Sequence, residues 1–391
     1  MTDFDYLATR QQHLRDHQQW RSLVPRAADG IYLIESDDRR LLNFGANDYL
    51  GLALEMRDRM AGSIGNGDSV HVPVSGGSGA SALVSGWTKQ HQRLSEQIAE
   101  FEGTESAVLF PTGFAACSGT VSALAEAGDL VLSDQLNHAS LIDGCRMSRA
   151  ERIVYPHADW KAVDQILRQR RDEFARVWIV TNTVFGMDGH VAPMDHLHEI
   201  AQTYSACLIA DEAHGTGVLG QDGSGVCEAL GVKDKVKIRI GTLSKAVGSQ
   251  GGFVAAPRVV IDHLVNHCRP LIYSTSLTPA AVVAATVGID QIRTQPQRQR
   301  RVNMLARRVR SQLSIEASTD LEASVPIIPV VVGEQNRAVQ LSRQLADSGF
   351  YVPAIRPPTV AEGTARLRIS LSAAHEDGMI EQLLDAVQAL L

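Results

Sequence analysis

The sequence predicts an α/β protein with a mainly parallel sheet, joined to a smaller α+β domain. From about residue 100 onward, short apolar runs alternate with longer helical patterns, which is typical of a parallel sheet with crossover helices. After about residue 285 this rhythm changes, and fewer strands follow. A chain of 391 residues is long enough for two domains. We expect an N-terminal arm over 1–45, a large domain over 46–285 and a small C-terminal domain over 286–391.

The large domain is predicted from its apolar runs, taken in chain order. Residues 1–20 are polar and predict an amphipathic N-terminal helix. A further helix is expected over His91–Phe101, because Leu94, Ile98 and Phe101 are spaced four and three apart and share one face. The expected strands are Ser106–Phe110, Asp129–Ser133, Arg152–Tyr155, Val177–Thr181, Ala206–Ala210, Ile238–Thr242 and Gly252–Ala255.

The small domain begins with a long helix that is rich in Arg and Gln. The elements expected after it are a strand over Pro326–Val332, a helix over Arg337–Ser348, an extended segment Tyr351–Ile355, a strand over Ala365–Ser372 and a helix over Glu376–Leu391. The last helix carries its apolar residues on one stripe, and this part of the chain is predicted to be a separate α+β domain.

Composition argues against several classes of partner. The formal net charge of −7 gives no electrostatic reason to expect nucleic acid or an anionic membrane. Six arginines that gather in one region predict only the solvated face of a helix; they are Arg298, Arg300, Arg301, Arg307, Arg308 and Arg310. No apolar stretch is long enough to span a membrane, and the polar N-terminus is unlike a signal peptide. We therefore expect a cytoplasmic protein.

The five cysteines predict no disulfide framework. They are Cys117, Cys145, Cys207, Cys227 and Cys268, an odd number with no C-x-x-C pair. Cys207 lies in an apolar run, where a buried thiol behaves as a small hydrophobic side chain. We expect the same of the other four, and none of them is a candidate nucleophile.

The first chemical signal is a pair of acids after a buried strand. Asp211 and Glu212 follow the run that ends at Ala210, and His214 comes two residues later. Ligands of open α/β sheets bind beyond the carboxyl ends of the strands, and a buried carboxylate there needs a positive partner. A protonated pyridine nitrogen would satisfy Asp211. A metal site is the alternative, since D-E-x-H supplies plausible ligands, but no second pair with matching spacing occurs.

The second signal is a lysine in a setting of small and hydroxyl residues. Lys245 follows the strand that ends at Thr242, next to Ser244 and before the glycine-rich Gly248–Gly252. A surface lysine in a loop is the simpler interpretation. Against it, the two hydroxyls suit a phosphate, and a desolvated lysine is what Schiff-base chemistry uses.

Two weaker signals involve anions. Thr112-Gly113-Phe114 lies between a strand and an alanine-rich helix, where backbone N–H groups form an anion site. In the strand that begins at Ala365, Arg366 and Arg368 share one face by the period of two. Either of these two arginines could clamp a substrate carboxylate through two parallel hydrogen bonds.

Taken together, these residues resemble the α-oxoamine synthases, a family of fold-type I pyridoxal-phosphate (PLP) transferases, over nearly the whole chain. The motifs that carry the resemblance are weak singly and stand in the family's order. They are Asn47-Asp48-Tyr49-Leu50-Gly51, Ser75-Gly76-Gly77-Ser78-Gly79, Thr112-Gly113-Phe114, Asn137-His138-Ala139-Ser140, Met187-Asp188-Gly189, Asp211-x-x-His214, Thr242-x-x-Lys245, Tyr273-Ser274-Thr275-Ser276, Ile355-Arg356-Pro357-Pro358-Thr359-Val360 and Gly363-Thr364-Ala365-Arg366-Leu367-Arg368. The resemblance implies PLP as cofactor and a homodimer with shared active sites.

The resemblance also implies a role for each candidate residue. Four would be catalytic: Lys245 as the Schiff-base lysine, Asp211 at the ring nitrogen, His214 at the ring hydroxyl and His138 stacked on the ring. The phosphate would lie among Thr112, Gly113, Phe114, Thr242 and Ser244, with Thr275 from the other subunit. Substrate would be bound by Arg368, which holds the amino acid carboxylate, and by Arg21, Asn47 and Arg356. No metal is implied.

The family condenses an amino acid with an acyl thioester and releases CO₂. The Arg356–Thr359 tail resembles that of members that join L-alanine to a pimeloyl thioester, on CoA or an acyl carrier protein, in biotin synthesis. A glycine-using sister enzyme such as glycine C-acetyltransferase stays an alternative, and an aminotransferase or a non-catalytic PLP-fold protein fits less well. Relatives commonly carry a glutamate and a serine where this chain has Asn182 and Gly186. We expect both changes near the substrate pocket, leaving it less acidic and roomier.

Overall fold

Seven strands form the central sheet of the protein, which is described here by a computed structural model covering residues 4–17, 19–56 and 76–391. The strand order is β4-β10-β9-β8-β7-β5-β6. The strands are β4 (Ser106–Phe110), β5 (Leu130–Asp134), β6 (Glu151–Tyr155), β7 (Val177–Asn182), β8 (Cys207–Asp211), β9 (Ile238–Thr242) and β10 (Gly252–Ala256). Each strand expected in the large domain is present, with ends within one residue of the expected ones. Only β10 runs antiparallel to its neighbours in this sheet.

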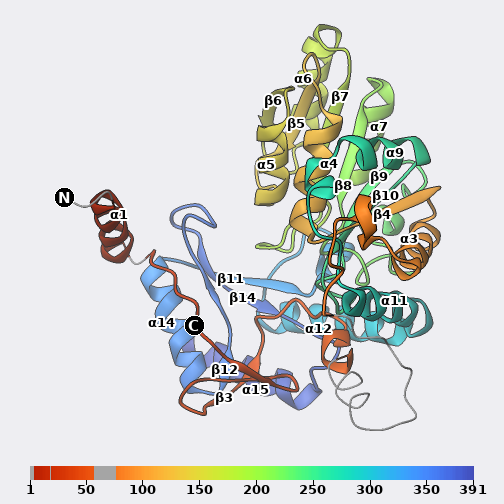
Figure 1. The fold of residues 1–391 in the computed structure, drawn as a ribbon. Coiled ribbons are helices and arrows are strands. Elements are labelled where there is room, and N and C mark those ends of the chain that lie inside the picture. Colours follow the sequence, from red (N-terminus) through yellow and green to blue (C-terminus); the bar gives the residue numbers. More distant parts are fainter. Residues whose placement is uncertain (1–3, 18, 57–75) are drawn as a thin grey trace, which may run out of the picture.

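Helices cover both faces of this sheet, which is why its central strands are buried throughout (Figure 1). One face packs against α4, α5, α9 and α10, and the other against α3, α6, α7 and α11. The predicted stripe Leu94, Ile98 and Phe101 of α3 is buried, as expected. The helices are α3 (Lys89–Glu102), α4 (Gly113–Leu124), α5 (Ala139–Met147), α6 (Trp160–Arg170), α7 (Met194–Thr203), α8 (Val226–Ala229), α9 (Arg258–His267), α10 (Arg269–Ile272), α11 (Pro279–Thr294) and α12 (Pro296–Gln312), with short turns η1 (Ala82–Gly86) and η2 (Arg171–Glu173).

The C-terminal part contains two small sheets. One has the order β11-β14-β13, and the other joins three N-terminal strands in the order β1-β2-β3-β12. The elements are β1 (Ala27–Asp29), β2 (Tyr32–Ile34), β3 (Arg40–Asn43), α13 (Asp320–Ala323), β11 (Ile327–Gly333), α14 (Gln335–Asp347), β12 (Phe350–Tyr351), β13 (Ala354–Ile355), β14 (Ala365–Ser370) and α15 (Asp377–Leu390). The sequence did not predict β1–β3. The segment expected to be extended divides at Pro353, which lacks an N–H, so β12 and β13 join different sheets.

Helix α12 corrects the expectation of a solvated basic face. Arg310 is buried and donates from Nη2 to the Ile327 carbonyl at 2.7 Å. Arg301 and Arg308 both pair with Asp377, and Arg298 pairs with Glu55. The arginines therefore attach this helix to its neighbours, because a long apolar stem can be buried while its head group stays bonded.

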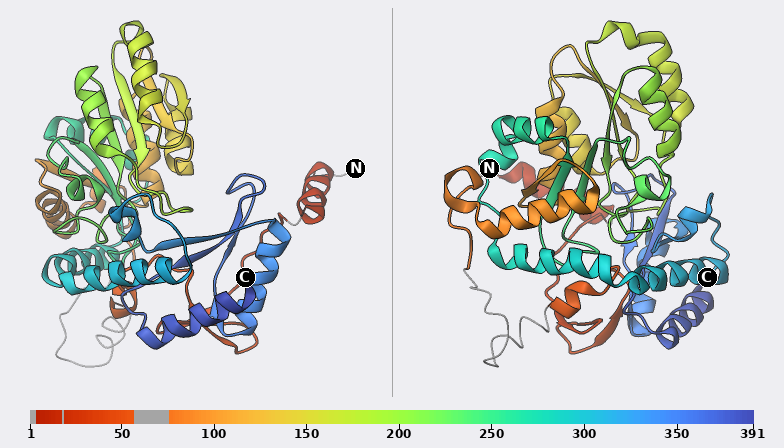
Figure 2. Two further views of the ribbon diagram at one scale, coloured as in Figure 1. Left: turned by 180° about the vertical axis from the view of Figure 1, so that it is seen from behind. Right: turned by 90° about the vertical axis from the view of Figure 1, so that its right-hand side faces the viewer.

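The large sheet with its helices and the C-terminal sheets lie on either side of α11 and α12, which run between them (Figure 2). Helix α1 (Asp5–Asp16) stands away from the rest of the molecule in the left view of Figure 2 and buries no residue. Among the described residues, no helix has both the length and the apolar character needed to cross a membrane.

Candidate active site

The candidate residues lie at the carboxyl ends of strands that run in the same direction. Because β4, β5, β7, β8 and β9 are mutually parallel, the segments that follow them meet at one edge of the sheet. Gly113 follows β4, His138 follows β5, Asn182 ends β7, Asp211 ends β8 and Lys245 follows β9. The topology thus brings together residues separated by more than 130 positions in the sequence.

Asp211 is a buried carboxylate held by neutral donors. It is 2% exposed, and its Oδ2 accepts from Asn182 Nδ2 at 2.7 Å and from Cys117 Sγ at 3.4 Å. Its Oδ1 accepts from the Ala213 N–H at 2.9 Å. Among the described residues no cationic side chain lies within 4 Å of it. A buried negative charge of this kind suits a cationic ligand group.

Lys245 lies in the same cluster and has an unusual pKa. Burial lowers the pKa of its ammonium from 10.5 to about 8, against the opposing effect of Asp211 and with a further lowering by Arg368. At pH 7 about a tenth of the side chain is then the free amine, far more than at the ordinary lysine pKa, and the free amine is the form that acts as a nucleophile.

A hydrogen-bonded chain connects His214 to Arg368. The Tyr49 hydroxyl lies 2.7 Å from His214 Nδ1 and donates to Asn47 Oδ1 at 3.1 Å, and Arg368 Nη2 donates to the same oxygen at 3.0 Å. Burial, together with nearby positive groups, holds the pKa of His214 well below its usual value. Burial also raises the pKa of Tyr49 to about 12, so this hydroxyl keeps its proton. Tyr49 is a site residue that the sequence reasoning missed; its only signal was the motif that contains it.

The structure separates the two arginines of β14. Arg366 forms an ion pair with Asp188. Arg368 is 4% exposed, donates to the Gly186 carbonyl and to Ser370 Oγ as well as to Asn47, and has no acidic partner among the described residues. Arg368 is therefore the arginine whose charge is available to a substrate.

His138 caps the helix that follows β5. Its Nδ1 lies 2.7 Å from Ser140 Oγ, and its ring meets that of Phe114 edge-on at 6.4 Å. Burial lowers the pKa of His138, although the nearby Asp211 opposes this effect. Burial therefore favours the neutral form of this imidazole.

The predicted phosphate corner comes together around Gly113. A Cβ on Gly113 would lie 3.1 Å from Thr242 Oγ1, so the start of α4 closely approaches the end of β9. Thr112 caps α4 by accepting from the Ala115 N–H. The hydroxyls of Thr242 and Ser244 both bond to the Gly251 carbonyl, at 3.0 and 3.2 Å.

Three predicted residues lie outside this cluster. Thr275 is exposed, and its backbone forms a bridge with Ser81. Arg21 donates to Thr359 Oγ1 at 2.9 Å, and Arg356 donates to the Trp20 carbonyl at 3.0 Å. These contacts join the N-terminal arm to the loop after β13. Ser75 of the glycine-rich motif lies outside the described residues.

Asn182 and Gly186 both lie beside candidate residues, Asp211 and Arg368. Asn182 is buried and bonded to Asp211, and the expectation of a less acidic substrate pocket stays a prediction. A Cβ on Gly186 would lie 2.6 Å from His214 Nε2, so the space that a side chain would fill already holds the imidazole. The sequence alone does not show which way these two positions face.

Two cysteines differ from the expectation that all five are buried hydrophobic side chains. Cys207 is exposed, because it begins β8 at the opposite edge of the sheet from Asp211. Cys117 is buried, but it donates a hydrogen bond to Asp211 and is not merely a hydrophobic filler. Burial raises its pKa well above the usual value, which keeps the thiol protonated.

The alternative of a metal site finds no support in the geometry. Glu212 turns away from Asp211 and accepts from Thr183 Oγ1 at 2.6 Å and from the N–H groups of Val226 and Cys227. Over the described ranges, no three His, Cys, Asp or Glu side chains are grouped as metal ligands would be.

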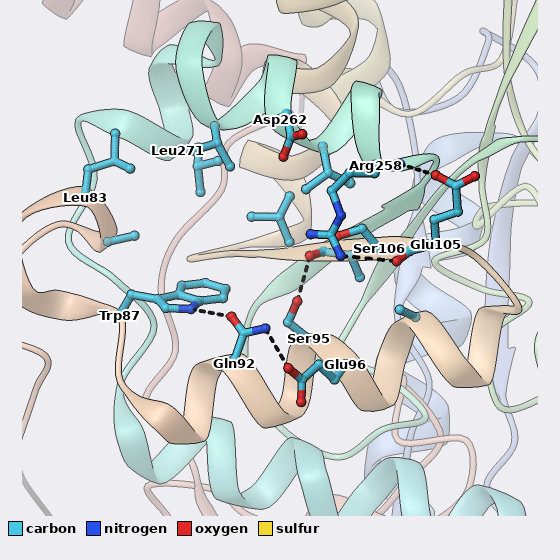
Figure 3. Close-up of a pocket in the computed structure, with 16 residues that line it drawn as sticks. Leu83, Trp87, Gln92, Ser95, Glu96, Glu105, Ser106, Arg258, Asp262 and Leu271 are labelled. Carbon is cyan, nitrogen blue, oxygen red and sulfur yellow. Dashed lines mark hydrogen bonds between the residues drawn. The ribbon is translucent and has the colours of Figure 1, made fainter.

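A hollow of about 380 Å³ opens between α3, β4 and α9, and it contains none of the candidate residues (Figure 3). Trp87 and Leu83 lie toward the left of it in this view, and Leu271 lies above Trp87. Its polar side chains are bonded to one another, as in the pairs Trp87–Gln92 and Gln92–Glu96. The hollow is therefore separate from the candidate active site.

Comparison with known proteins agrees with this arrangement. The sequence matches the family described as class I and II aminotransferases over residues 39–387. It is 39% identical over 352 residues to 8-amino-7-oxononanoate synthase of Lysinibacillus sphaericus, with 90% of this chain and 89% of that protein covered. It is 43% identical over 378 residues to the enzyme of the same name from Methylococcus capsulatus, with 95% of each covered.

The comparison with solved structures supports the same family. The structure of a serine palmitoyltransferase variant from S. paucimobilis, with a PLP–myriocin aldimine bound, superposes with a TM-score of 0.88 at 28% identity, covering 100% of this chain and 97% of that one. The sequence match, the shared architecture and the residues gathered at the sheet edge lead to one assignment. This chain belongs to the class I and II aminotransferase family and, within it, to the α-oxoamine synthases that include the 8-amino-7-oxononanoate synthases.

Proposed function

We propose that this protein is a PLP-dependent acyltransferase that condenses L-alanine with a pimeloyl thioester to give 8-amino-7-oxononanoate, CO₂ and the free carrier thiol, in biotin synthesis. The observation that carries the proposal is the juxtaposition of Lys245, whose pKa is lowered to about 8, with the buried carboxylate of Asp211 and the unpaired guanidinium of Arg368. The amine can bond to the aldehyde of PLP, and the carboxylate can pair with a protonated ring nitrogen. The guanidinium can bind the carboxylate of a substrate.

The described residues fit PLP. Lys245 would hold its aldehyde carbon and Asp211 its ring nitrogen, while His214 would meet the ring hydroxyl and His138 the ring face. The phosphate would lie at the start of α4, bounded by Thr112, Gly113, Phe114, Thr242 and Ser244. Thr275 would reach it from the other subunit. When bound, PLP supplies an electron sink next to the substrate α-carbon.

The chain's own groups supply binding and proton transfer. Arg368 orients the amino acid by its carboxylate, and Asn47 fixes the guanidinium in place. The Lys245 amine would take the substrate α-proton and later return one, for which a pKa near the working pH is suitable. Arg21 and Arg356, at the junction of the arm and the C-terminal part, would bind the acyl or carrier side.

We also propose a cytoplasmic homodimer. Apolar side chains are exposed on η1, at the start of α4 and at the end of α10, and α10 contacts both other elements. These side chains are Leu83, Val84 (80% exposed), Phe114 and Tyr273 (71% exposed). Exposed apolar side chains on neighbouring elements support a protein interface, and Phe114 among them belongs to the phosphate corner. Val84→Asp should shift the mass measured by light scattering from dimer to monomer and lower PLP affinity. The free cysteines support a reducing compartment.

The test of the function is a substrate matrix. L-Alanine, glycine and L-serine are each assayed with pimeloyl-CoA and acetyl-CoA, and CoA release and CO₂ are measured. Alanine with the pimeloyl thioester should give the highest kcat/KM, and a one-methyl difference predicts about ten- to two-hundred-fold less with glycine. A higher kcat/KM for glycine with acetyl-CoA would assign the chain to the sister activity instead. Repeating the best pair with a pimeloyl acyl carrier protein distinguishes the carriers.

A further inference from the structure

Asn182 connects the two chain segments that carry the proposed ring contacts. It ends β7 and stands opposite Asp211 in the β7–β8 register. Its Nδ2 donates to Asp211 Oδ2 at 2.7 Å, and its Oδ1 accepts from the His138 N–H, also at 2.7 Å. Its own N–H donates to Asn137 Oδ1 at 2.9 Å. One side chain, 3% exposed, thus bonds to the carboxylate after β8 and to the first turn of α5 after β5.

Both ends of this amide are determined by their partners. The His138 N–H can only donate and the Asp211 carboxylate accepts, so the amide oxygen must face the former and the nitrogen the latter. Aspartate has the same shape but lacks a donor when ionised. Alanine or serine would be too short to bridge both groups.

The other contacts of Asp211 cannot replace this bond. Cys117 Sγ is a weak donor at 3.4 Å, and the Ala213 N–H bonds to the other carboxylate oxygen. Asn182 is therefore the strong side-chain donor on Oδ2. Losing it would leave a buried carboxylate free to rotate or to turn toward Lys245.

We infer that Asn182 is a positioning residue that fixes the Asp211 carboxylate relative to His138 at the start of α5. PLP would then be contacted at its ring nitrogen and at its ring face at the same time. The inference deepens the proposed function and rests on it.

Asn182→Asp provides the sharpest test, because its effect should depend on pH. While the new carboxyl holds a proton, it can donate to Asp211 and accept from His138, as the amide does. Two carboxylates in such close contact share one proton, which leaves as the pH rises. The variant should then bind PLP more weakly as the pH increases. The neighbouring titratable groups are the same in both proteins, so the wild-type curve measured in parallel accounts for their contribution to the pH dependence. They are His138, His214, Lys245 and Cys117.

The readouts are the PLP dissociation constant of the apo-protein and the induced circular dichroism of bound PLP, each between about pH 6 and about pH 9. We expect the ratio of variant to wild-type dissociation constants to rise about tenfold or more across this range, the equivalent of one charge-assisted hydrogen bond. The induced signal should fall in parallel. Asn182→Ala should show a loss that does not vary with pH.

Asn303→Asp is the matched control. Asn303 is partly buried in α12, donates to the Val218 and Ser324 carbonyls, and bonds to none of the candidate residues. It should leave both readouts unchanged. The inference is overturned if Asn182→Asp binds PLP like the wild type at every pH, or if its loss is as independent of pH as that of Asn182→Ala. If Asn182→Asp does not fold, Asn182→Ala decides, and wild-type affinity and dichroism in that variant overturn the inference. Failure of the wild type to bind PLP through Lys245 would instead refute the proposed function.

Discussion

Arg368 offers the most direct test of substrate binding. A guanidinium has five N–H groups. Three of them donate hydrogen bonds within the protein, one to each of three acceptors. The acceptors are the Gly186 carbonyl at 2.6 Å, Ser370 Oγ at 2.7 Å and Asn47 Oδ1 at 3.0 Å. The remaining two lie on Nη1 and Nη2, which is the fork that binds a carboxylate through two parallel bonds. Arg368→Ala should therefore weaken binding of the amino acid specifically.

The magnitude follows from the burial of the group. Truncating one partner of a buried, hydrogen-bonded charge pair costs about 2–5 kcal/mol, or about 30- to 4,000-fold in affinity. We expect the KM for L-alanine to rise by at least about 30-fold, while the KM for the thioester changes by less than about threefold. Arg368→Lys should restore little, because an ammonium lacks the planar fork. Spectroscopic titration of the PLP-loaded protein with L-alanine checks the binding step separately from turnover.

Arg366 supplies the matched control, since it lies two residues away on the same buried strand but is paired with Asp188. Arg366→Ala should lower the melting temperature and change the KM for alanine at least tenfold less than Arg368→Ala does. Equal changes in the KM of both substrates, or the same alanine-specific loss in both variants, would show that Arg368 does not bind the carboxylate.

Further variants test the cofactor side. Lys245→Ala should fold, but it should give no borohydride-reducible adduct with PLP; a reducible adduct in this variant would place the Schiff base elsewhere. In the wild type, the rate of PLP incorporation should rise with pH and level off above about 8, because the lowered pKa of Lys245 sets the fraction of free amine. Asp211→Asn removes a charge that raises this pKa, so the midpoint should move to lower pH, and activity should fall by about a hundredfold or more; an unchanged midpoint contradicts the electrostatic coupling. Tyr49→Phe should lower kcat about five- to tenfold by releasing His214 Nδ1, with little change in melting temperature, and wild-type kcat would exclude that role.

The sequence alone determined the strands of the large sheet and the residues that follow them. Each buried strand is a short apolar run between helical patterns, a local signal that needs no knowledge of distant contacts. The parallel alternation then requires the carboxyl ends to meet at one edge. Asp211 and Lys245 could be predicted as neighbours for this reason, although 34 positions separate them in the chain.

Only the tertiary structure decided how individual side chains are partnered. The period of two places Arg366 and Arg368 on the same face, so no local pattern distinguishes the paired arginine from the available one. The difference comes from the loop after β7. It places the Asp188 carboxylate beside Arg366 but only the Gly186 carbonyl oxygen beside Arg368. The roles of Asn182, Gly186 and Cys117 depend in the same way on atoms contributed by other strands. Hydrogen bonds over such separations leave no periodicity in the sequence, so only the folded chain reveals them.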